Sequence, residues 1–194
     1  MKDLTVFFLL LVILAVFYLY LEQKALQVIY IEAYDGKRYL VRDQKDKEDA
    51  AELLANIASN CQKLVTHVYN NRDSYSDAKR KIDIERLHKN FRPDAISESS
   101  PNNNYTSYSI NKGEQIVLCL RNGDKLVDIN TMMFVVLHEF AHLATESIGH
   151  SQEFWDNFKW ILEESINIGI YIKTDYNKKA VEYCGMKINT TPLD

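Results

Sequence analysis

The fold of this chain is decided by residues 132–145, which read MMFVVLHEFAHLAT. Apolar side chains occupy almost every position around this stretch, a pattern typical of a helix buried on all sides. Asn130 can cap the helix at its start. Three ionisable side chains, His138, Glu139 and His142, interrupt the apolar run, and burying them is costly without compensation. The stretch therefore predicts a central helix that carries a functional site.

The spacing of these three residues suits a metal. Residues four apart lie on one face of a helix about one turn apart, so His138 and His142 can direct two imidazoles at one ion. Glu139 projects to the side, where its carboxylate can reach a metal-bound water. Zinc with three protein ligands keeps a fourth position open and lowers the pKa of its water to about 7. The pattern predicts a catalytic zinc site, and the alternative is two core histidines bonded to backbone groups.

The third ligand must come from outside this helix. Astacin-like and matrix proteases would need glycine at position 145 and histidine at position 148, but the chain has Thr145 and Ile148. The sequence therefore excludes that class of metalloprotease.

One histidine and two acidic residues remain as candidates for the third ligand. Glu163 and Glu164 lie in the next predicted helix, as in a thermolysin-like arrangement. His150 directly follows Gly149, and a glycine lets the backbone turn so that the imidazole faces back toward the metal. We expect His150 to complete the site, with Glu163 or Glu164 as the alternative.

Working outward, hydrophobic periodicity and turn residues predict the remaining elements. The predicted elements are a hairpin at Val28 to Tyr34 and Lys37 to Arg42, helices at Lys47 to Asn70 and Ser76 to Asn90, a loop at Ser97 to Ser107, a hairpin at Tyr108 to Ile110 and Gln115 to Arg121, and a helix capped by Ser151. The tail from Ile170 to Asp194 has no clear period. Its tyrosines Tyr171, Tyr176 and Tyr183 could donate a hydrogen bond to an oxyanion.

Composition excludes some classes of function. A length of 194 residues fits a single domain. Lys and Arg number 23 against 27 Asp and Glu, which gives a net charge of −4. This balance gives no electrostatic footprint for nucleic acid, so we expect no nucleic-acid partner.

Residues 4–21 form a separate apolar run in which only Thr5 is polar. Eighteen helical residues span about 27 Å, close to a hydrocarbon core of about 30 Å. Tyr18 and Tyr20 lie at its end, as in an interfacial belt. The run predicts a retained transmembrane anchor with the membrane as partner, and a cleaved signal peptide or a buried helix are the alternatives.

The side of the membrane is indicated by charge and by cysteines. Basic residues Lys24, Lys37 and Arg38 follow the run, which favours a cytoplasmic body. Cys61, Cys119 and Cys184 are odd in number and lack metal-site spacing, which also suits a reducing compartment. We expect Cys184 to be a small buried residue rather than a thiolate ligand of zinc.

The motifs resemble one family. HEFAH at 138–142, GHS at 149–151 and FW at 154–155 are similar to the sites of WLM and SprT-like zinc metallopeptidases. The resemblance implies that His138, His142 and His150 bind Zn²⁺ and that Glu139 is the catalytic acid/base. It also implies that residues 115–121 are an edge strand along which a peptide substrate pairs. The loop at 146–148 is longer than in close members of the family.

Together these observations predict an α+β, zincin-like fold, mainly helical with a small antiparallel sheet, plus an N-terminal transmembrane helix. The predicted domains are an anchor at 1–23, a β-hairpin at 24–45 and a metallopeptidase domain at 46–194. The predicted function is a single-pass, membrane-anchored zinc metallopeptidase acting on proteins or peptides. The alternative is a zinc-stabilised module that binds protein without cutting it. The sequence gives no oligomeric state.

Overall fold

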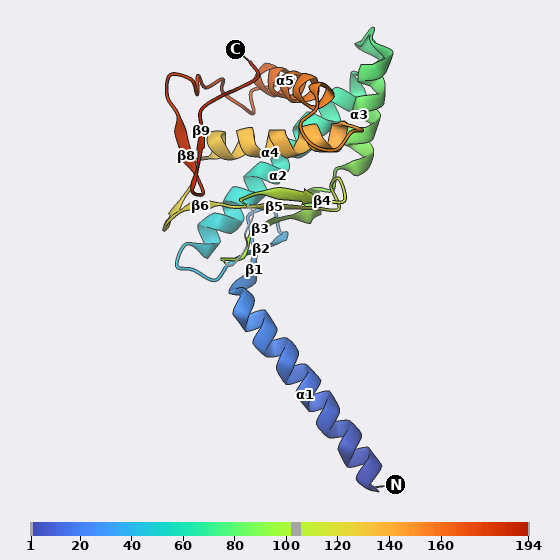
Figure 1. Ribbon diagram of the computed structural model, residues 1–194, viewed down its shortest axis with the longest axis vertical. Helices are drawn as coiled ribbons and strands as arrows, with labels where there is room; N and C mark the ends of the chain where they lie inside the picture. Colours follow the sequence, from blue (N-terminus) through green and yellow to red (C-terminus); the bar gives the residue numbers. More distant parts are fainter. Residues whose placement is uncertain (1, 102–105, 194) are drawn as a thin grey trace.

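The computed structural model describes residues 2–101 and 106–193 and, within the first helix, the side chains of residues 5–21. It is an α+β structure built around helix α4 (Ile129–Ala144). Figure 1 shows α4 between a small sheet and helix α5 (Gln152–Asn167), with the long helix α2 (Lys47–Asn70) running behind. The central helix predicted from its apolar run is therefore the element around which the others pack.

Helix α2 supplies the largest continuous part of the core. Its apolar side chains recur every three or four residues, and those facing inward, such as Leu54, Ile57 and Leu64, are fully buried. Helix α3 (Ala78–Asn90) is shorter and more polar, and the Asp77 carboxylate caps it by accepting from Lys79 N–H. Both helices lie where the sequence predicts them.

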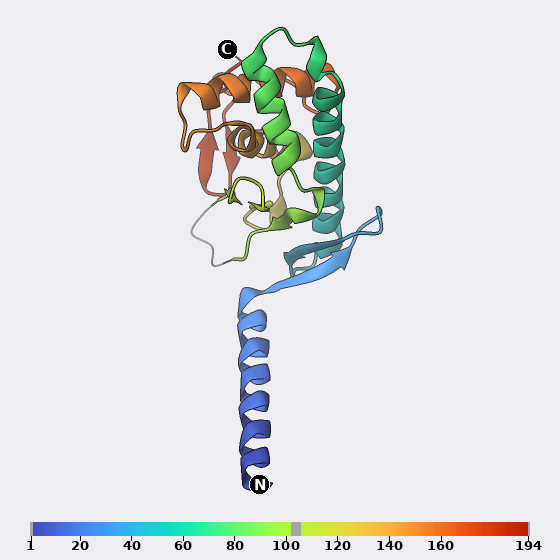
Figure 2. The same cartoon turned by 90° about the vertical axis from the view of Figure 1, so that its right-hand side faces the viewer.

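The N-terminal hairpin consists of β1 (Val28–Glu32) and β2 (Arg38–Arg42), which pair antiparallel around the predicted Asp35-Gly36 turn. Tyr39 and Val41 point into the core together with residues of α2. Figure 2 shows this hairpin lying between α1 and the body.

A three-stranded sheet lies under α4, and two predictions about it are wrong. The strand order is β3 (Ile96–Glu98), β5 (Gln115–Leu118), β4 (Tyr108–Ile110). Since β3 is parallel to β5 and β4 is antiparallel to it, the sheet is mixed rather than antiparallel. Since β5 is the central strand, the edge that lies beside α4 is β4, not residues 115–121.

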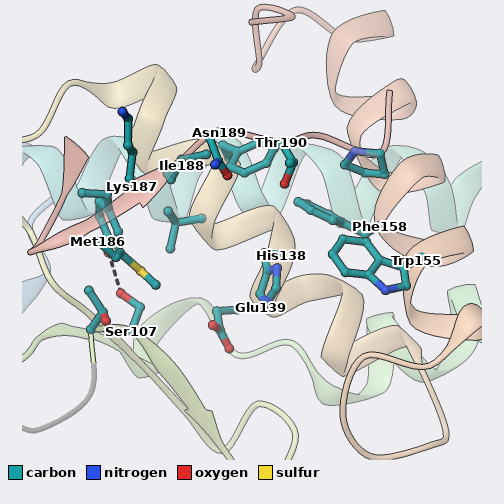
Figure 3. Close-up of a pocket in the computed structure, with 15 residues that line it drawn as sticks. Ser107, His138, Glu139, Trp155, Phe158, Met186, Lys187, Ile188, Asn189 and Thr190 are labelled. Atoms are coloured by element: carbon teal, nitrogen blue, oxygen red, sulfur yellow. Dashed lines mark hydrogen bonds between the residues drawn. The ribbon is translucent and has the colours of Figure 1, made fainter. Parts of the chain in front are cut away.

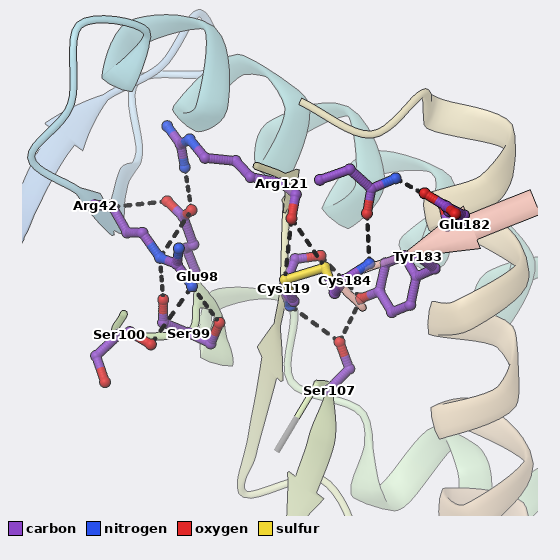
Figure 4. Close-up of a disulfide and its surroundings, with 11 residues drawn as sticks. Arg42, Glu98, Ser99, Ser100, Ser107, Cys119, Arg121, Glu182, Tyr183 and Cys184 are labelled. Atoms are coloured by element: carbon purple, nitrogen blue, oxygen red, sulfur yellow. Dashed lines mark hydrogen bonds and ion pairs between the residues drawn. A yellow bond between two sulfur atoms is a disulfide. The ribbon is translucent and has the colours of Figure 1, made fainter. Parts of the chain in front are cut away.

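The last two residues of strand β3, Ser97 and Glu98, fall inside the segment that the sequence predicts as a loop. Its polar residue Glu98 is buried because the carboxylate pairs with the Arg121 guanidinium and accepts from Arg42 N–H at 2.7 Å (Figure 4). Local composition does not reveal this pairing, because both arginines lie far away in sequence. Residues 102–105 of the predicted loop lie outside the described residues.

Two short hairpins complete the fold. Strands β6 (Arg121–Asn122) and β7 (Lys125–Leu126) pair antiparallel, as do β8 (Val181–Tyr183) and β9 (Met186–Ile188). The second hairpin lies in the tail, where the sequence shows no period. A disulfide joins Cys119, just after β5, to Cys184 in the turn between β8 and β9. Disulfides are rare in reducing compartments, so this bond weighs against the reducing compartment that the number of cysteines favours.

Helix α1 (Lys2–Leu26) extends away from the rest of the chain (Figures 1 and 2). Its described apolar side chains, such as Phe8 and Ile13, are exposed. Among the described residues, no helix combines the length and the apolar character needed to cross a membrane. The predicted transmembrane helix and single-pass membrane localisation are therefore wrong; the outer residues of the predicted 1–23 anchor lie outside the described side chains.

Candidate metal centre

Helix α4 positions the first two histidines and the glutamate. It begins after Asp128, whose carboxylate accepts from Thr131 N–H at 3.0 Å and from the Thr131 hydroxyl at 2.7 Å. The N-cap is therefore Asp128 rather than Asn130. Asn130 instead bonds the backbone of Ile172 at 2.8 and 2.9 Å and so ties the helix start to the tail. Because the helix is buried on most sides, its polar residues are fixed in direction.

His138, His142 and His150 meet in a triangle. The three pairs of ring centroids are each 5.0 Å apart, and one nitrogen of each ring lies within 4.8 Å of the others. The Nε2 atoms of His138 and His150 are 3.1 Å apart. Two nitrogens bound to one tetrahedral zinc lie about 3.3 Å apart, so the arrangement suits such an ion. These three imidazoles form a group that could hold a metal.

The helix-borne histidines are held in the neutral form that binds metals. Burial and the neighbouring imidazoles lower the pKa of His138 to about 3. Burial, the neighbouring His150 and the Lys112 ammonium lower the pKa of His142 to about 4. At neutral pH a metal therefore competes with no proton at these two nitrogens.

Glu139 lies beside the triangle and is 6% exposed. Burial raises the pKa of its carboxyl to about 7, and hydrogen bonds from the side chain and backbone of Ser109 oppose this rise. Ser109 belongs to β4, so the edge strand and the carboxylate are in direct contact. A carboxylate in this position can take a proton from a water and return it to another atom.

The loop at residues 145–151 positions the third histidine. Gly149 has φ of +80°, a conformation that most residues avoid, and this turn aims His150 at α4. Ser151 caps α5 by accepting from Phe154 N–H, as its sequence predicts. The His150 ring lies beside the Trp155 ring, with centroids 5.9 Å apart and planes tilted by 32°.

Two charged side chains fasten this loop. The Lys112 ammonium donates to the carbonyl oxygens of Thr145, Glu146 and Ser147 at 2.5, 2.7 and 3.1 Å. The Glu153 carboxylate accepts from the Ser147 hydroxyl at 3.0 Å and backbone N–H at 3.3 Å. The loop that carries the third imidazole is thus held from two directions.

Lys112 reaches the loop through a strained turn between β4 and β5. Lys112 has φ of +54° and Gly113 has φ of +106°. A Cβ atom at position 113 would lie 2.5 Å from the Asn90 carbonyl oxygen and 2.9 Å from Leu143 Cδ2. Only glycine therefore lets this turn approach α4 closely enough for Lys112 to reach its carbonyl partners.

Two cavities open at His138 and Glu139. The first, about 310 Å³, lies between α4, α5 and β9, and is lined mostly by apolar and aromatic side chains (Figure 3). The second, about 580 Å³, lies between β4 and the 145–151 loop and contains Ser109, Lys112 and His142. The centre therefore has an apolar side and a polar side, a shape suited to an extended chain lying across it.

The other candidate residues lie elsewhere. Glu164 accepts from the Tyr75 hydroxyl at 2.7 Å and faces His67, and Glu163 is exposed, so neither joins the histidines. Of the three oxyanion candidates, Tyr171 and Tyr176 pack around Phe134 in the core.

Tyr183 alone of those tyrosines lines a cavity at the centre. Its hydroxyl donates to the Cys119 carbonyl at 2.9 Å and lies 2.5 Å from the Ser107 hydroxyl (Figure 4). Because this hydroxyl proton is already in a hydrogen bond, Tyr183 does not offer it to an oxyanion in this arrangement.

Sequence reasoning did not predict Ser109, Lys112 and Glu153 as parts of the site. Ser109 and Lys112 lie in a predicted hairpin and its turn, where polar residues are ordinary. Glu153 has the one available signal, because it is an acidic residue in the first turn of a helix that begins next to a candidate ligand.

Comparisons with known proteins match this region. The family model described as WLM domain matches residues 77–192, which include the three histidines and Glu139. Uncharacterised protein R325 of Acanthamoeba polyphaga mimivirus is 33% identical over 156 residues, covering 79% of this chain and 78% of that protein. Uncharacterised protein 136R of Invertebrate iridescent virus 6 is 40% identical over 72 residues, covering 35% and 40% respectively. Uncharacterised protein 042R of Invertebrate iridescent virus 3 is 40% identical over 83 residues, covering 41% and 50%. No solved structure matches the chain.

Proposed function

The chain belongs to the WLM domain family, and from this premise we propose that it is a zinc-dependent metallopeptidase that hydrolyses peptide bonds in proteins. The observation that carries the proposal is the triangle of three imidazoles with Glu139 beside it. A structural zinc site is usually closed by four protein ligands, whereas three ligands and an adjacent carboxylate leave a position for water. The described residues bring only the three histidines into ligand distance of one another, so the fourth position stays available.

The roles of the residues follow from their positions. His138, His142 and His150 would hold the zinc ion, which supplies Lewis-acid activation of a water and of the scissile carbonyl. Glu139 takes the proton of the attacking water and returns it to the amine that leaves. Ser109 bonds the Glu139 carboxylate from β4 and so keeps it in one orientation.

Strand β4 offers a place for the substrate backbone. It is an edge strand of the described sheet, lies beside α4 and lines the polar cavity together with Glu139. An extended peptide can add to such an edge through main-chain hydrogen bonds, which give affinity without regard to sequence. We assign the substrate edge to β4.

The test is cleavage of an unfolded protein by the full chain, with bound zinc quantified. Glu139→Gln keeps the shape of the side chain but removes its basicity. We expect about one zinc per chain in both proteins and a loss of about 10²- to 10⁴-fold in kcat for the variant. Glu163→Gln, the same change at an exposed position of α5, is the control and should keep full activity.

Two outcomes would contradict the proposal. Stoichiometric zinc with no cleavage that depends on Glu139 would favour a module that binds protein without cutting it. Absence of bound zinc would exclude both functions.

A further inference from the structure

The apolar cavity beside the catalytic centre has no role in the mechanism above. Phe134 and Val135 of α4, Trp155 and Phe158 of α5, and Met186 of β9 contribute to its walls (Figure 3). His138 and Glu139 lie at its end, so it opens directly onto the position of the scissile bond. A substrate side chain that fills the cavity must therefore belong to a residue next to that bond.

We propose that this cavity is the specificity pocket of the enzyme and that it receives a large uncharged apolar side chain, such as that of Phe or Leu, from the substrate residue next to the scissile bond. This inference rests on the proposed peptidase function. Consecutive residues of an extended chain are about 3.5 Å apart, so a peptide carbonyl held at the histidines leaves only an adjacent side chain close enough to enter.

The volume fits a large side chain. A cavity of about 150 Å³ lined by apolar groups is enough to bind a benzene ring. At about 310 Å³ this pocket has room for an aromatic or a long aliphatic side chain. A glycine or alanine would leave most of it filled with water and would gain little binding energy from it.

The charges around the pocket disfavour an ionised side chain. Besides His138 and Glu139 at the end, the charged residue of the lining is Lys187, and Figure 3 shows its amino group pointing away from those two residues. An Asp side chain entering the pocket would lose water and would meet the Glu139 carboxylate rather than the Lys187 amino group. The polar cavity on the other side of the centre can accept an acidic side chain, since Ser109 and Lys112 contribute to its lining.

Two rim residues are exposed although they are apolar. Trp155 is 40% exposed and Met186 is 51% exposed, and Figure 3 shows them on opposite sides of the pocket. Large apolar groups gathered at the mouth of a cavity are typical of a surface that a ligand covers. Because Met186 is half exposed, it can be replaced without disturbing the core.

The experiment uses the full chain loaded with zinc. Bonds cut in an unfolded casein are first identified by mass spectrometry, and matched peptides are then made around one such bond with Phe, Leu, Gly or Asp beside it. We expect Phe and Leu peptides to exceed the Gly peptide by about 10- to 100-fold in kcat/KM, with Asp lowest. Met186→Lys should reduce this preference at least about tenfold and should improve cleavage of the Asp peptide.

The control is Ile82→Lys. Ile82 is 57% exposed on α3 and lines neither cavity at the centre, so the same introduction of a charge should leave the ranking of the peptides unchanged. Equal cleavage of all four peptides, or a ranking that Met186→Lys does not alter, would overturn the inference.

Binding separates this inference from the proposed function. For this assay the peptides share one fixed sequence, chosen without regard to cleavage, with Phe, Leu or Asp at its central position. The zinc-loaded Glu139→Gln protein should bind the Phe and Leu peptides at least about tenfold more tightly than the Asp peptide, measured by fluorescence anisotropy. If that ranking of affinities is found while the unmodified chain cuts no protein, the proposed side-chain preference of the pocket is supported and the proposed peptidase function is contradicted. If the unmodified chain cuts peptides but neither assay shows the ranking, the peptidase function is supported and the proposed side-chain preference of the pocket is contradicted.

Discussion

The two sides of helix α4 are held in place by different forces. On the apolar side, the β8–β9 hairpin is joined to the end of β5 by the Cys119–Cys184 disulfide (Figure 4). On the polar side, the 145–151 loop is fastened by hydrogen bonds from Lys112 and to Glu153. A disulfide is broken by reductant, whereas hydrogen bonds between charged groups are weakened when one partner loses its charge. The pocket wall and the third histidine should therefore respond to different conditions.

This difference matters because the two sides carry different tasks. His138 and His142 are fixed by the buried helix and need no further support. His150 lies on an exposed loop and depends on side chains outside it for its position. Zinc affinity should accordingly depend on the loop contacts rather than on the disulfide, while the free energy of unfolding should depend more on the disulfide than on the loop contacts.

The largest effect is expected from removal of the disulfide. In the Cys119→Ser/Cys184→Ser double variant the unfolded chain gains the freedom of a loop of 65 residues. Chain entropy predicts a loss of about 4 kcal/mol in the free energy of unfolding. Urea titration monitored by tryptophan fluorescence would measure it.

Reductant supplies the control for the disulfide. Dithiothreitol should lower the stability of the unmodified chain by a similar amount and leave the double variant unchanged. An equal stability of the two proteins under oxidising conditions would show that the bond contributes nothing to the fold.

A smaller effect is expected from Lys112→Met, which removes the donor to three loop carbonyls. The loop then holds His150 less firmly, and removing an outer partner of a metal ligand typically costs about 10- to 100-fold in metal affinity. Competition with a chelating dye would measure the dissociation constant. Lys125→Met, the same change at an exposed position of β7, should bind zinc as the unmodified chain does.

Much of the helical framework follows from the sequence. Helix α2 has the predicted bounds Lys47–Asn70 because its apolar period is regular and its core contacts lie on one face. The histidines at 138 and 142 are one turn apart in any helix, so their pairing is a local property. His150 meets them as expected, because the turn at Gly149 brings the short 145–151 loop back toward the end of the same helix.

The features that the sequence does not predict depend on contacts between distant residues. Glu98 lies in a polar stretch and becomes a buried strand residue only because Arg121 pairs with it. Cys119 pairs with Cys184 across 65 residues, and nothing in the spacing of three cysteines indicates which two meet. The mixed sheet has the same origin, since the parallel pairing of β3 with β5 joins segments about 20 residues apart.

The smallest effect is expected from Glu153→Gln, and it should depend on pH. Partial burial raises the pKa of Glu153, but hydrogen bonds from Ser147 and Lys79 outweigh this and bring it to about 2. Because the folded pKa lies below the unfolded value of about 4.3, the stabilisation is present at neutral pH and is lost as the pH falls toward 2. In the zinc-free chain the variant should be less stable by about 1 kcal/mol at pH 7.

Urea titrations of both zinc-free proteins at pH 7, 4 and 3 measure how the difference in their free energies of unfolding changes with pH. The difference between them should narrow from pH 7 to pH 3, because below about pH 4.3 the unfolded chain binds a proton at Glu153 that the folded chain, in which the pKa of Glu153 is about 2, does not bind. Glu163→Gln, at an exposed position of the same helix, should show no such narrowing. A difference that stays constant with pH would mean that the loop is held by shape rather than by the charge of Glu153, and the contrast between the two sides of α4 would then rest on Lys112 alone.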